Sequence, residues 1–177
     1  MKWVINMKKE KIEYIFENKN EKNLTIIDVK ERIKEYIEEN EEGKYKIMIG
    51  TDSQGFSDYT KFVTALIIKK EGKPLWNCHM IYKEYRRIKT IRRKISLETS
   101  FTEKMILEIK SMLENTMKDK KKIQLELEGH IDVGLTDRSK TKIFAKEMIE
   151  RIEKIGAIAK TKPNSMVASS YANRFTK

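Results

Sequence analysis

Three carboxylates in this sequence stand where burial, rather than contact with water, is expected. Asp52 follows the apolar run in "IMIGTDSQG", and Asp132 ends the alternating segment "IQLELEGHID". Glu98 lies in a helical stretch among Met and Phe side chains. Burying a carboxylate is costly unless its charge is compensated. If the two strands are neighbours and the helix faces the sheet, the three acids converge.

Converging carboxylates raise one another's pKa values, and a bound divalent cation relieves their repulsion. Hard oxygen ligands suit Mg²⁺ or Mn²⁺. Two such ions can activate a water molecule and stabilise the leaving oxygen in phosphodiester cleavage. We therefore expect Asp52, Glu98 and Asp132 to bind Mg²⁺ or Mn²⁺ and to be catalytic.

The position of Glu98 has two interpretations. On a helical wheel of about 100° per residue, Glu98 falls in the middle of the apolar stripe that contains Phe101 and Met105, whereas Glu103 and Glu114 fall on the opposite face. One interpretation is a metal-binding acid that faces the sheet. The other is a frayed first turn, or a glutamate stabilised by the dipole near the helix N-terminus.

Periodicity and turn residues predict the elements that position these acids. We expect an N-terminal helix capped by Thr25, and then three strands over residues 45–52, 61–69 and 75–85. A helix over 91–117, a strand that ends near Asp132, a helix over 139–155, a short strand in "GAIAKTK" and a final helix opened by Pro163 follow.

This order of elements is that of a ribonuclease H-like sheet. We expect an α/β fold with a five-stranded mixed sheet in the order 3-2-1-4-5. Helices should cover both faces, and the N-terminal helix is an extra element. Residues 1–24 are predicted as a polar leader and residues 25–177 as a single ribonuclease H-like domain, a size ordinary for one domain.

Composition restricts the class of protein. No apolar run approaches the roughly 18–20 residues of a membrane span, and no signal peptide is evident at the N-terminus, so no membrane partner is expected. The single cysteine, Cys78, forms no intramolecular disulfide and fits the reducing cytoplasm. With only His79 and His130 besides, a structural zinc site is not expected.

The positive charge is unevenly distributed. The chain has a formal net charge of +11, but residues 1–42 contain 9 Lys/Arg and 11 Asp/Glu. The remainder contains 29 basic and 16 acidic residues, a balance of +13. A basic body favours a polyanionic partner, most often nucleic acid. A Lys-rich coding bias that also produces Glu and Ile is the alternative.

The strongest basic segment, "YRRIKTIRRK", lies between the third predicted strand and the helix of Glu98. Tyr85 could stack on a base and the cations could bind phosphates. A solvated charged turn is the alternative. The candidate nucleic-acid-binding residues are Tyr85, Arg86, Arg87, Lys89, Arg92, Arg93 and Lys94.

His130 precedes Asp132 by two residues on the same strand face. It could contact the scissile phosphate or transfer a proton, or it could be a packed, hydrogen-bonded histidine. The following segment, "DVGLTDRSKT", is similar to the phosphate loops of actin-like ATPases. That class needs two such domains around a nucleotide, and this chain supplies one.

Three segments together resemble the YkuK-type ribonuclease H-like family. They are "IGTDSQ" (49–54), "HIDVG" (130–134) and "KPNSMVASSYANR" (162–174), and the helix "LTIIDVKERIKEYIEE" also matches. The likeness covers residues 18–177 and implies a ribonuclease H-like fold. It also implies that Asp52 is the first-strand acid, Glu98 the helix acid and Asp132 the fourth-strand acid.

The final segment departs from the family pattern, in which it often begins "KPD" and ends "ADR". Asn164 and Asn173 stand at those positions here. A ribonuclease H site commonly takes a fourth carboxylate from its last helix, and Asn164 could offer a metal only a carbonyl oxygen. The expected function is a metal-dependent nuclease acting on nucleic acid. The alternative is a non-catalytic nucleic-acid-binding or regulatory module that retains the fold.

Overall fold

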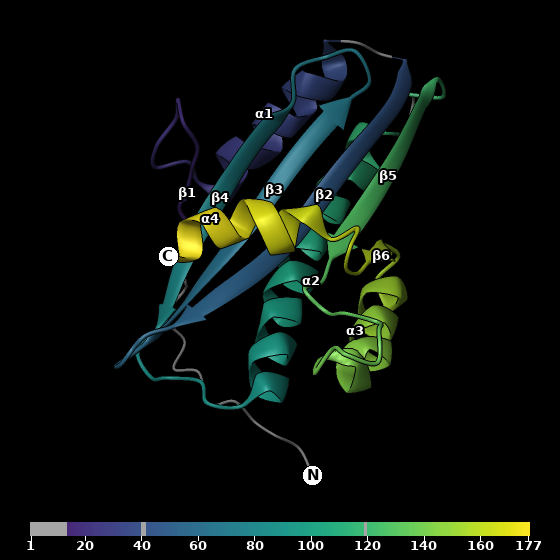
Figure 1. Cartoon of the computed structure of the whole chain (residues 1–177). Coiled ribbons are helices and arrows are strands. Elements are labelled where there is room, and N and C mark those ends of the chain that lie inside the picture. Colours follow the sequence, from purple (N-terminus) through teal and green to yellow (C-terminus); the bar gives the residue numbers. More distant parts are fainter. Residues whose placement is uncertain (1–13, 40–41, 119) are drawn as a thin grey trace.

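The computed structural model describes residues 14–39, 42–118 and 120–177 of the chain. Its centre is a six-stranded mixed sheet in the order β1-β4-β3-β2-β5-β6 (Figure 1). The strands are β1 (Phe16–Glu17), β2 (Gly43–Gly55), β3 (Thr60–Lys70), β4 (Trp76–Glu84), β5 (Ile123–His130) and β6 (Ile158–Lys160).

The antiparallel meander β2–β3–β4 and the parallel pairs β2–β5 and β5–β6 reproduce the predicted order 3-2-1-4-5. The predicted count of five strands was wrong, because β1 adds a sixth strand at the edge beside β4. Two apolar layers flank the sheet. The larger core contains α1 (Ile26–Glu38), α2 (Ile91–Thr116) and α3 (Lys142–Lys154), and the smaller contains the π-helical turn η1 (Val167–Ala172). Figure 1 shows η1 and α4 (Asn173–Thr176) lying across the face opposite α2. The predicted helices on both faces are confirmed.

The N-terminal helix α1 begins where the sequence predicted it. The Thr25 hydroxyl accepts from the Asp28 amide, and the Asp28 carboxylate accepts from the Thr25 amide at 2.7 Å. This reciprocal capping box satisfies amides that lack a partner inside the helix. Val29, Ile33 and Ile37 then place one buried stripe against the sheet.

Part of the predicted polar leader belongs to the fold. Phe16 pairs with Met80 of β4, and the Phe16 amide donates to the Leu24 carbonyl at 2.7 Å. Both Phe16 and Leu24 are buried in the larger core. The fold therefore begins before residue 25, while residues 1–13 of the predicted leader lie outside the described residues.

The last predicted helix was misplaced at its start. Pro163 lies in a turn in which the Asn164 amide donates to the Thr161 carbonyl at 2.7 Å. The regular helix η1 begins at Val167. Proline favours turns as well as first helical turns, so Pro163 alone did not fix the boundary.

No helix among the described residues is long and apolar enough to cross a membrane.

Candidate functional site

Asp52 and Asp132 lie beside each other because β2 and β5 are parallel and in register. Gly50 is opposite His130. Asp52 follows Gly50 by two residues, and Asp132 follows His130 by two residues. Neighbouring strands lie about 4.8 Å apart. Strand β5 ends at His130 while β2 continues to Gly55, so β2 has no strand partner on this edge from Thr51 onward. This notch in the sheet is where the acids gather.

Gly50 permits the C-terminal segment to pack at the notch. A Cβ on Gly50 would lie 2.8 Å from the Ala168 amide nitrogen and 3.0 Å from His130 Cβ. Such contacts are closer than side chains tolerate, so only glycine allows η1 to rest directly on β2. The backbone at Gly50 is therefore held by η1 on one face of the sheet as well as by its two strand neighbours.

Glu98 reaches the notch from the other face of the sheet. It lies about two turns into α2 and is only 5% exposed. Its Oε1 accepts a hydrogen bond of 2.7 Å from Ser53 Oγ, next to Asp52 in the chain. Thr102 Oγ1, one turn further along α2, donates to Thr51 Oγ1 at 3.0 Å. Because Glu98 is buried beyond the first turn of α2, both the frayed-turn and the helix-dipole interpretations are excluded.

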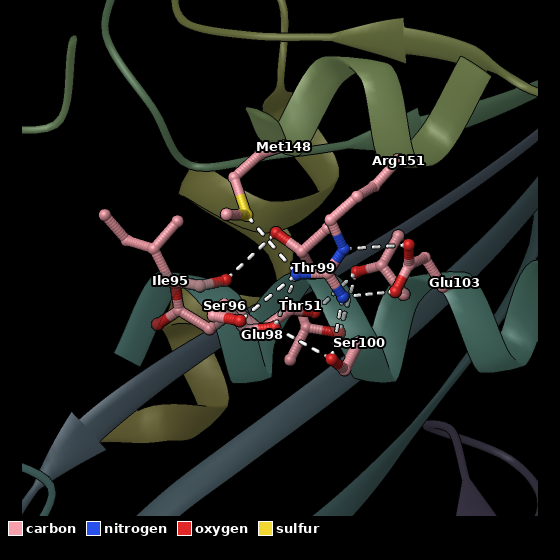
Figure 2. A network of polar contacts seen from close by, with 10 residues as sticks. Thr51, Ile95, Ser96, Glu98, Thr99, Ser100, Glu103, Met148 and Arg151 are labelled. Atoms are coloured by element: carbon pink, nitrogen blue, oxygen red, sulfur yellow. Dashed lines mark hydrogen bonds and ion pairs between the residues drawn. The ribbon is translucent and has the colours of Figure 1, made fainter. Parts of the chain in front are cut away.

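A second set of polar contacts holds α2 in place from behind. Arg151 of α3 donates to both carboxylate oxygens of Glu103, and also to Ser96 and Ser100 (Figure 2). The carboxylate of Glu98, on the same helix, contacts Ser53 of β2 instead. Because α2 is bound to β2 and to α3, the carboxylate of Glu98 is held on a rigid element.

Burial and the charges of neighbouring acids make Glu98 and Asp52 unusually hard to ionise. Burial, together with the charges of Asp52 and Asp132, raises the pKa of Glu98 to about 8 against the opposing effects of Lys94 and Ser53. The pKa of Asp52, which is 8% exposed, is raised by burial and by Asp132, while Lys94 and Lys162 oppose the shift. The three carboxylates therefore form one electrostatic unit.

Two lysines partly neutralise this unit. Lys94 Nζ lies 3.8 Å from Glu98 Oε1, and Lys162 Nζ lies 3.0 Å from Asp132 Oδ1. That oxygen of Asp132 is buried and accepts no hydrogen bond of good geometry from the described residues, although the ammonium is close. From the sequence, Lys94 was predicted to bind phosphate and Lys162 was given no role. Lys162 reaches the site from a loop 30 residues after Asp132.

The donor set is chemically suited to a hard divalent ion, because carboxylate oxygens are the ligands that Mg²⁺ and Mn²⁺ prefer. The under-coordinated Asp132 Oδ1 points to the same kind of ligand. Within the described residues, however, no three His, Cys, Asp or Glu side chains are already arranged as a metal site. A metal would have to displace Lys162 and draw the carboxylates inward.

The structure favours the packed alternative for His130. Its Nδ1 accepts from the Val167 amide at 3.2 Å, so Nε2 carries the proton and faces Glu128 Oε2 at 3.0 Å. Burial lowers the pKa of this histidine, against the opposing charge of Glu128. Nδ1 therefore holds β5 against η1, while Nε2 pairs with Glu128 of the same strand.

Asn164, the predicted amide ligand of a metal, is exposed in the turn before η1. The structure gives its side chain no contact with the three acids, because the helix starts later than predicted. The loop that carries Asn164 instead directs Lys162 at Asp132. The loop thus brings a cation to the site where a carboxylate would be expected.

The basic segment 85–94 comprises the connection from β4 to α2 and the first turn of α2, and it is exposed over most of its length. Tyr85 is 85% exposed. Arg86 pairs with Glu84 at 2.7 Å, and Arg92 lies 3.5 Å from Glu147. Among the described residues, Arg87, Lys89 and Arg93 have no carboxylate within 4.0 Å. These three cations are the ones best placed to bind an added anion.

A mixed sheet with one acid in its first core strand, a second just after its fourth and a third on the intervening helix defines a ribonuclease H-like protein. Comparison with known proteins agrees. A family described as "Ribonuclease H-like" matches residues 28–177. The "Uncharacterized protein YkuK" of Bacillus subtilis (strain 168) is 38% identical over 173 residues, 93% of this chain and 98% of the relative. The chain belongs to the ribonuclease H-like family.

Proposed function

We propose that the protein is a metal-dependent nuclease that cleaves nucleic acid phosphodiester bonds. The observation that carries this proposal is the electrostatic unit of Asp52, Glu98 and Asp132 at the notch beside β2. An arrangement that raises the pKa of buried acids weakens folding and is characteristic of a functional site. The ribonuclease H-like fold supports action on nucleic acid. A reducing cytoplasmic location, expected from the single cysteine, belongs to the same proposal.

Asp52, Glu98 and Asp132 would hold Mg²⁺ or Mn²⁺, which when bound supplies water activation and stabilisation of the leaving oxygen. The protein's part is positional. Ser53 orients the Glu98 carboxylate through its 2.7 Å hydrogen bond, and α2 is fixed by Arg151 on its other side. Once displaced from Asp132, Lys162 would be free to bind a phosphate oxygen of the substrate.

The direct test is hydrolysis of labelled single-stranded, duplex and hybrid substrates across titrations of Mg²⁺ and Mn²⁺. Cleavage should require the metal and stop with a chelator. Absence of cleavage of every substrate by folded protein, with nucleic acid still bound, would favour the second candidate. That candidate is a non-catalytic nucleic-acid-binding or regulatory module, and the Lys162–Asp132 pair is the observation that favours it.

Lys162 gives a prediction on metal affinity. Replacing it with methionine keeps much of the side-chain length but removes the cation next to Asp132. Because the ammonium competes with the metal for the same oxygen, Lys162→Met should bind Mn²⁺ about tenfold more tightly, since charges a few ångströms apart at a protein surface interact by about 1–4 kcal/mol. Isothermal titration calorimetry measures this change.

Lys160→Met is the matched control, because Lys160 Nζ lies 3.8 Å from Glu128 rather than from one of the three acids. Its Mn²⁺ affinity should stay within about twofold of wild type, an allowance of roughly 0.4 kcal/mol. Equal affinities of Lys162→Met and wild type would contradict a metal site that includes Asp132.

The basic segment gives a prediction on nucleic-acid affinity. Arg87 and Arg93 are unpaired among the described residues, whereas Arg86 and Arg92 already have acidic neighbours. Arg87→Ala with Arg93→Ala should therefore weaken binding more than the matched pair Arg86→Ala with Arg92→Ala. For duplex DNA, each lost phosphate contact should reduce the slope of log K against log salt by about 0.9.

Fluorescence anisotropy between 50 and 300 mM salt, roughly the range over which counterion release is strong, measures both slopes. Wild-type affinity and slope in both double variants would show that segment 85–94 is a solvated face and would leave the nucleic-acid site to be found elsewhere.

A further inference from the structure

A second group of side chains lies on the hairpin that continues β2 beyond Asp52. Phe56 and Tyr59 close the turn between β2 and β3, where the Phe56 amide donates to the Tyr59 carbonyl at 2.8 Å. Their rings are stacked, with centroids 4.6 Å apart and planes 13° from parallel. Lys61 Nζ lies 5.8 Å from the Phe56 ring centroid, and Lys83 Nζ lies 5.3 Å from that of Tyr59. We call these four residues the hairpin platform.

The two lysines of the hairpin platform are not arranged for stability. Lys61 and Lys83 are directly opposite each other across β3 and β4, and like charges in that position are destabilising. Neither has an Asp or Glu side-chain carboxylate within 4.0 Å among the described residues. Lys61 Nζ does donate to the main-chain oxygen of Lys177 at 3.1 Å. Burial and the neighbouring charge of Lys83 lower the pKa of Lys61. An anion between the two ammonium groups would relieve this repulsion.

The hairpin platform shares a sheet face with Asp52. Asp52 pairs with Val63, and two residues further along the strands Gln54, Lys61 and Lys83 form the next cross-strand row. Side chains two residues apart point to the same face, about 7 Å apart along the strand. Ile81, Gln54 and Lys83 are exposed, so this part of the face is open. Figure 1 shows the β2–β3 hairpin extending past η1 and α4.

Paired cations beside stacked aromatic rings match the chemistry of a single nucleic acid strand, in which phosphates alternate with bases whose π-faces are unpaired. A paired duplex presents its phosphates but not the faces of its bases. We propose that the hairpin platform binds a single-stranded segment of nucleic acid next to the site at Asp52. This inference rests on the proposed action on nucleic acid and names the form of the substrate at one subsite.

The geometry gives the order of the contacts. The Lys61–Lys83 row binds the phosphate nearest to Asp52, and the aromatic pair lies beyond it. From Asp52 to Phe56 the strand covers about 13 Å, the length of about four stacked nucleotides. On binding, each ammonium moves from its ring face to a phosphate oxygen, and a base takes its place on the ring.

The test compares binding of labelled single-stranded and duplex oligonucleotides by anisotropy in the presence of a chelator, so that no cleavage occurs. Phe56→Leu with Tyr59→Leu should weaken single-strand binding about tenfold, as expected for lost base stacking, and duplex binding less than twofold. Lys61→Ala with Lys83→Ala should reduce the single-strand salt slope by about 1.4. The control is Lys146→Ala with Lys154→Ala on α3, which removes the same charge.

Circular dichroism and melting curves establish that each variant folds. The lysine double variant decides the case if the aromatic one fails to fold, because Lys83 is exposed and Lys61 only half-buried. Single-strand affinities equal to that of the α3 control, or no single-strand binding by the wild type, would overturn the proposal. Wild-type binding at the hairpin platform without cleavage under any metal would overturn the nuclease function alone.

Discussion

Replacing Asp52 with asparagine is expected to lower the rate of metal-dependent cleavage by at least about a hundredfold. Substitution of a residue that only supports a metal ligand commonly costs 10- to 100-fold, and Asp52 is proposed as a direct ligand. Asparagine has nearly the same shape but lacks the charge that offsets dehydration of a divalent ion. Steady-state cleavage of the best substrate at saturating Mg²⁺ and Mn²⁺ measures the loss.

Asp137→Asn is the control for this substitution. It is the same chemical change, made five residues after Asp132. Asp137 is exposed and is paired with Lys142 rather than with the three acids. Its activity should equal that of the wild type. Cleavage by Asp52→Asn at the wild-type rate, with binding intact, would mean that the hydrolysis does not use the notch beside β2.

Glu98→Gln is expected to stabilise the metal-free protein while abolishing its cleavage activity. Because the pKa of Glu98 is about 8 when folded and its ordinary value is 4.5, the folded chain binds more protons than the unfolded chain between these values. The free energy of unfolding therefore falls as the pH rises through this window. Glutamine carries no ionisable group, so it removes the cost of burying a charge.

The gain should appear at pH 8.5 and vanish near pH 4. The difference between a pKa of 4.5 and one of about 8 corresponds to about 4–5 kcal/mol. For a chain of this length each 1 kcal/mol raises the melting temperature by about 2–4 °C, so we expect an increase of about 8–20 °C at the higher pH. Thermal melts with a chelator measure it. Glu103→Gln should do the opposite, because it breaks the pair with Arg151. A Glu98→Gln protein less stable than wild type at both pH values would contradict this account.

The sequence predicted the elements that carry long, regular patterns. The three-strand meander, the parallel strand β5 and the helix of Glu98 were correct because alternation and helical spacing persist over many residues. The burial of Glu98 was also predicted, since a charge in an apolar stripe is visible on a helical wheel. By contrast, β1 has only two residues, and Phe16 gave no periodicity by which to recognise it.

The rest of the site depends on contacts between distant residues. Lys162 lies near Asp132 because a loop after β6 turns back over the notch, and no local spacing encodes that path. The stacking of Phe56 on Tyr59 depends on how the turn between β2 and β3 directs these two side chains, and no sequence pattern predicts that direction. The role of His130 in holding η1 likewise required the position of Val167.

The central position of β2 also bears on amide hydrogen exchange. Strand β2 has hydrogen-bonded neighbours on both sides up to Gly50, whereas β6 is a three-residue strand at the edge of the sheet. Amides deep in a sheet exchange only through large openings, and those at short edges exchange through local ones. The strand that carries Asp52 should thus exchange slowly, and the segment after β6 that carries Lys162 should exchange quickly. Structural adjustment to a ligand would then be confined to the more labile side of the notch.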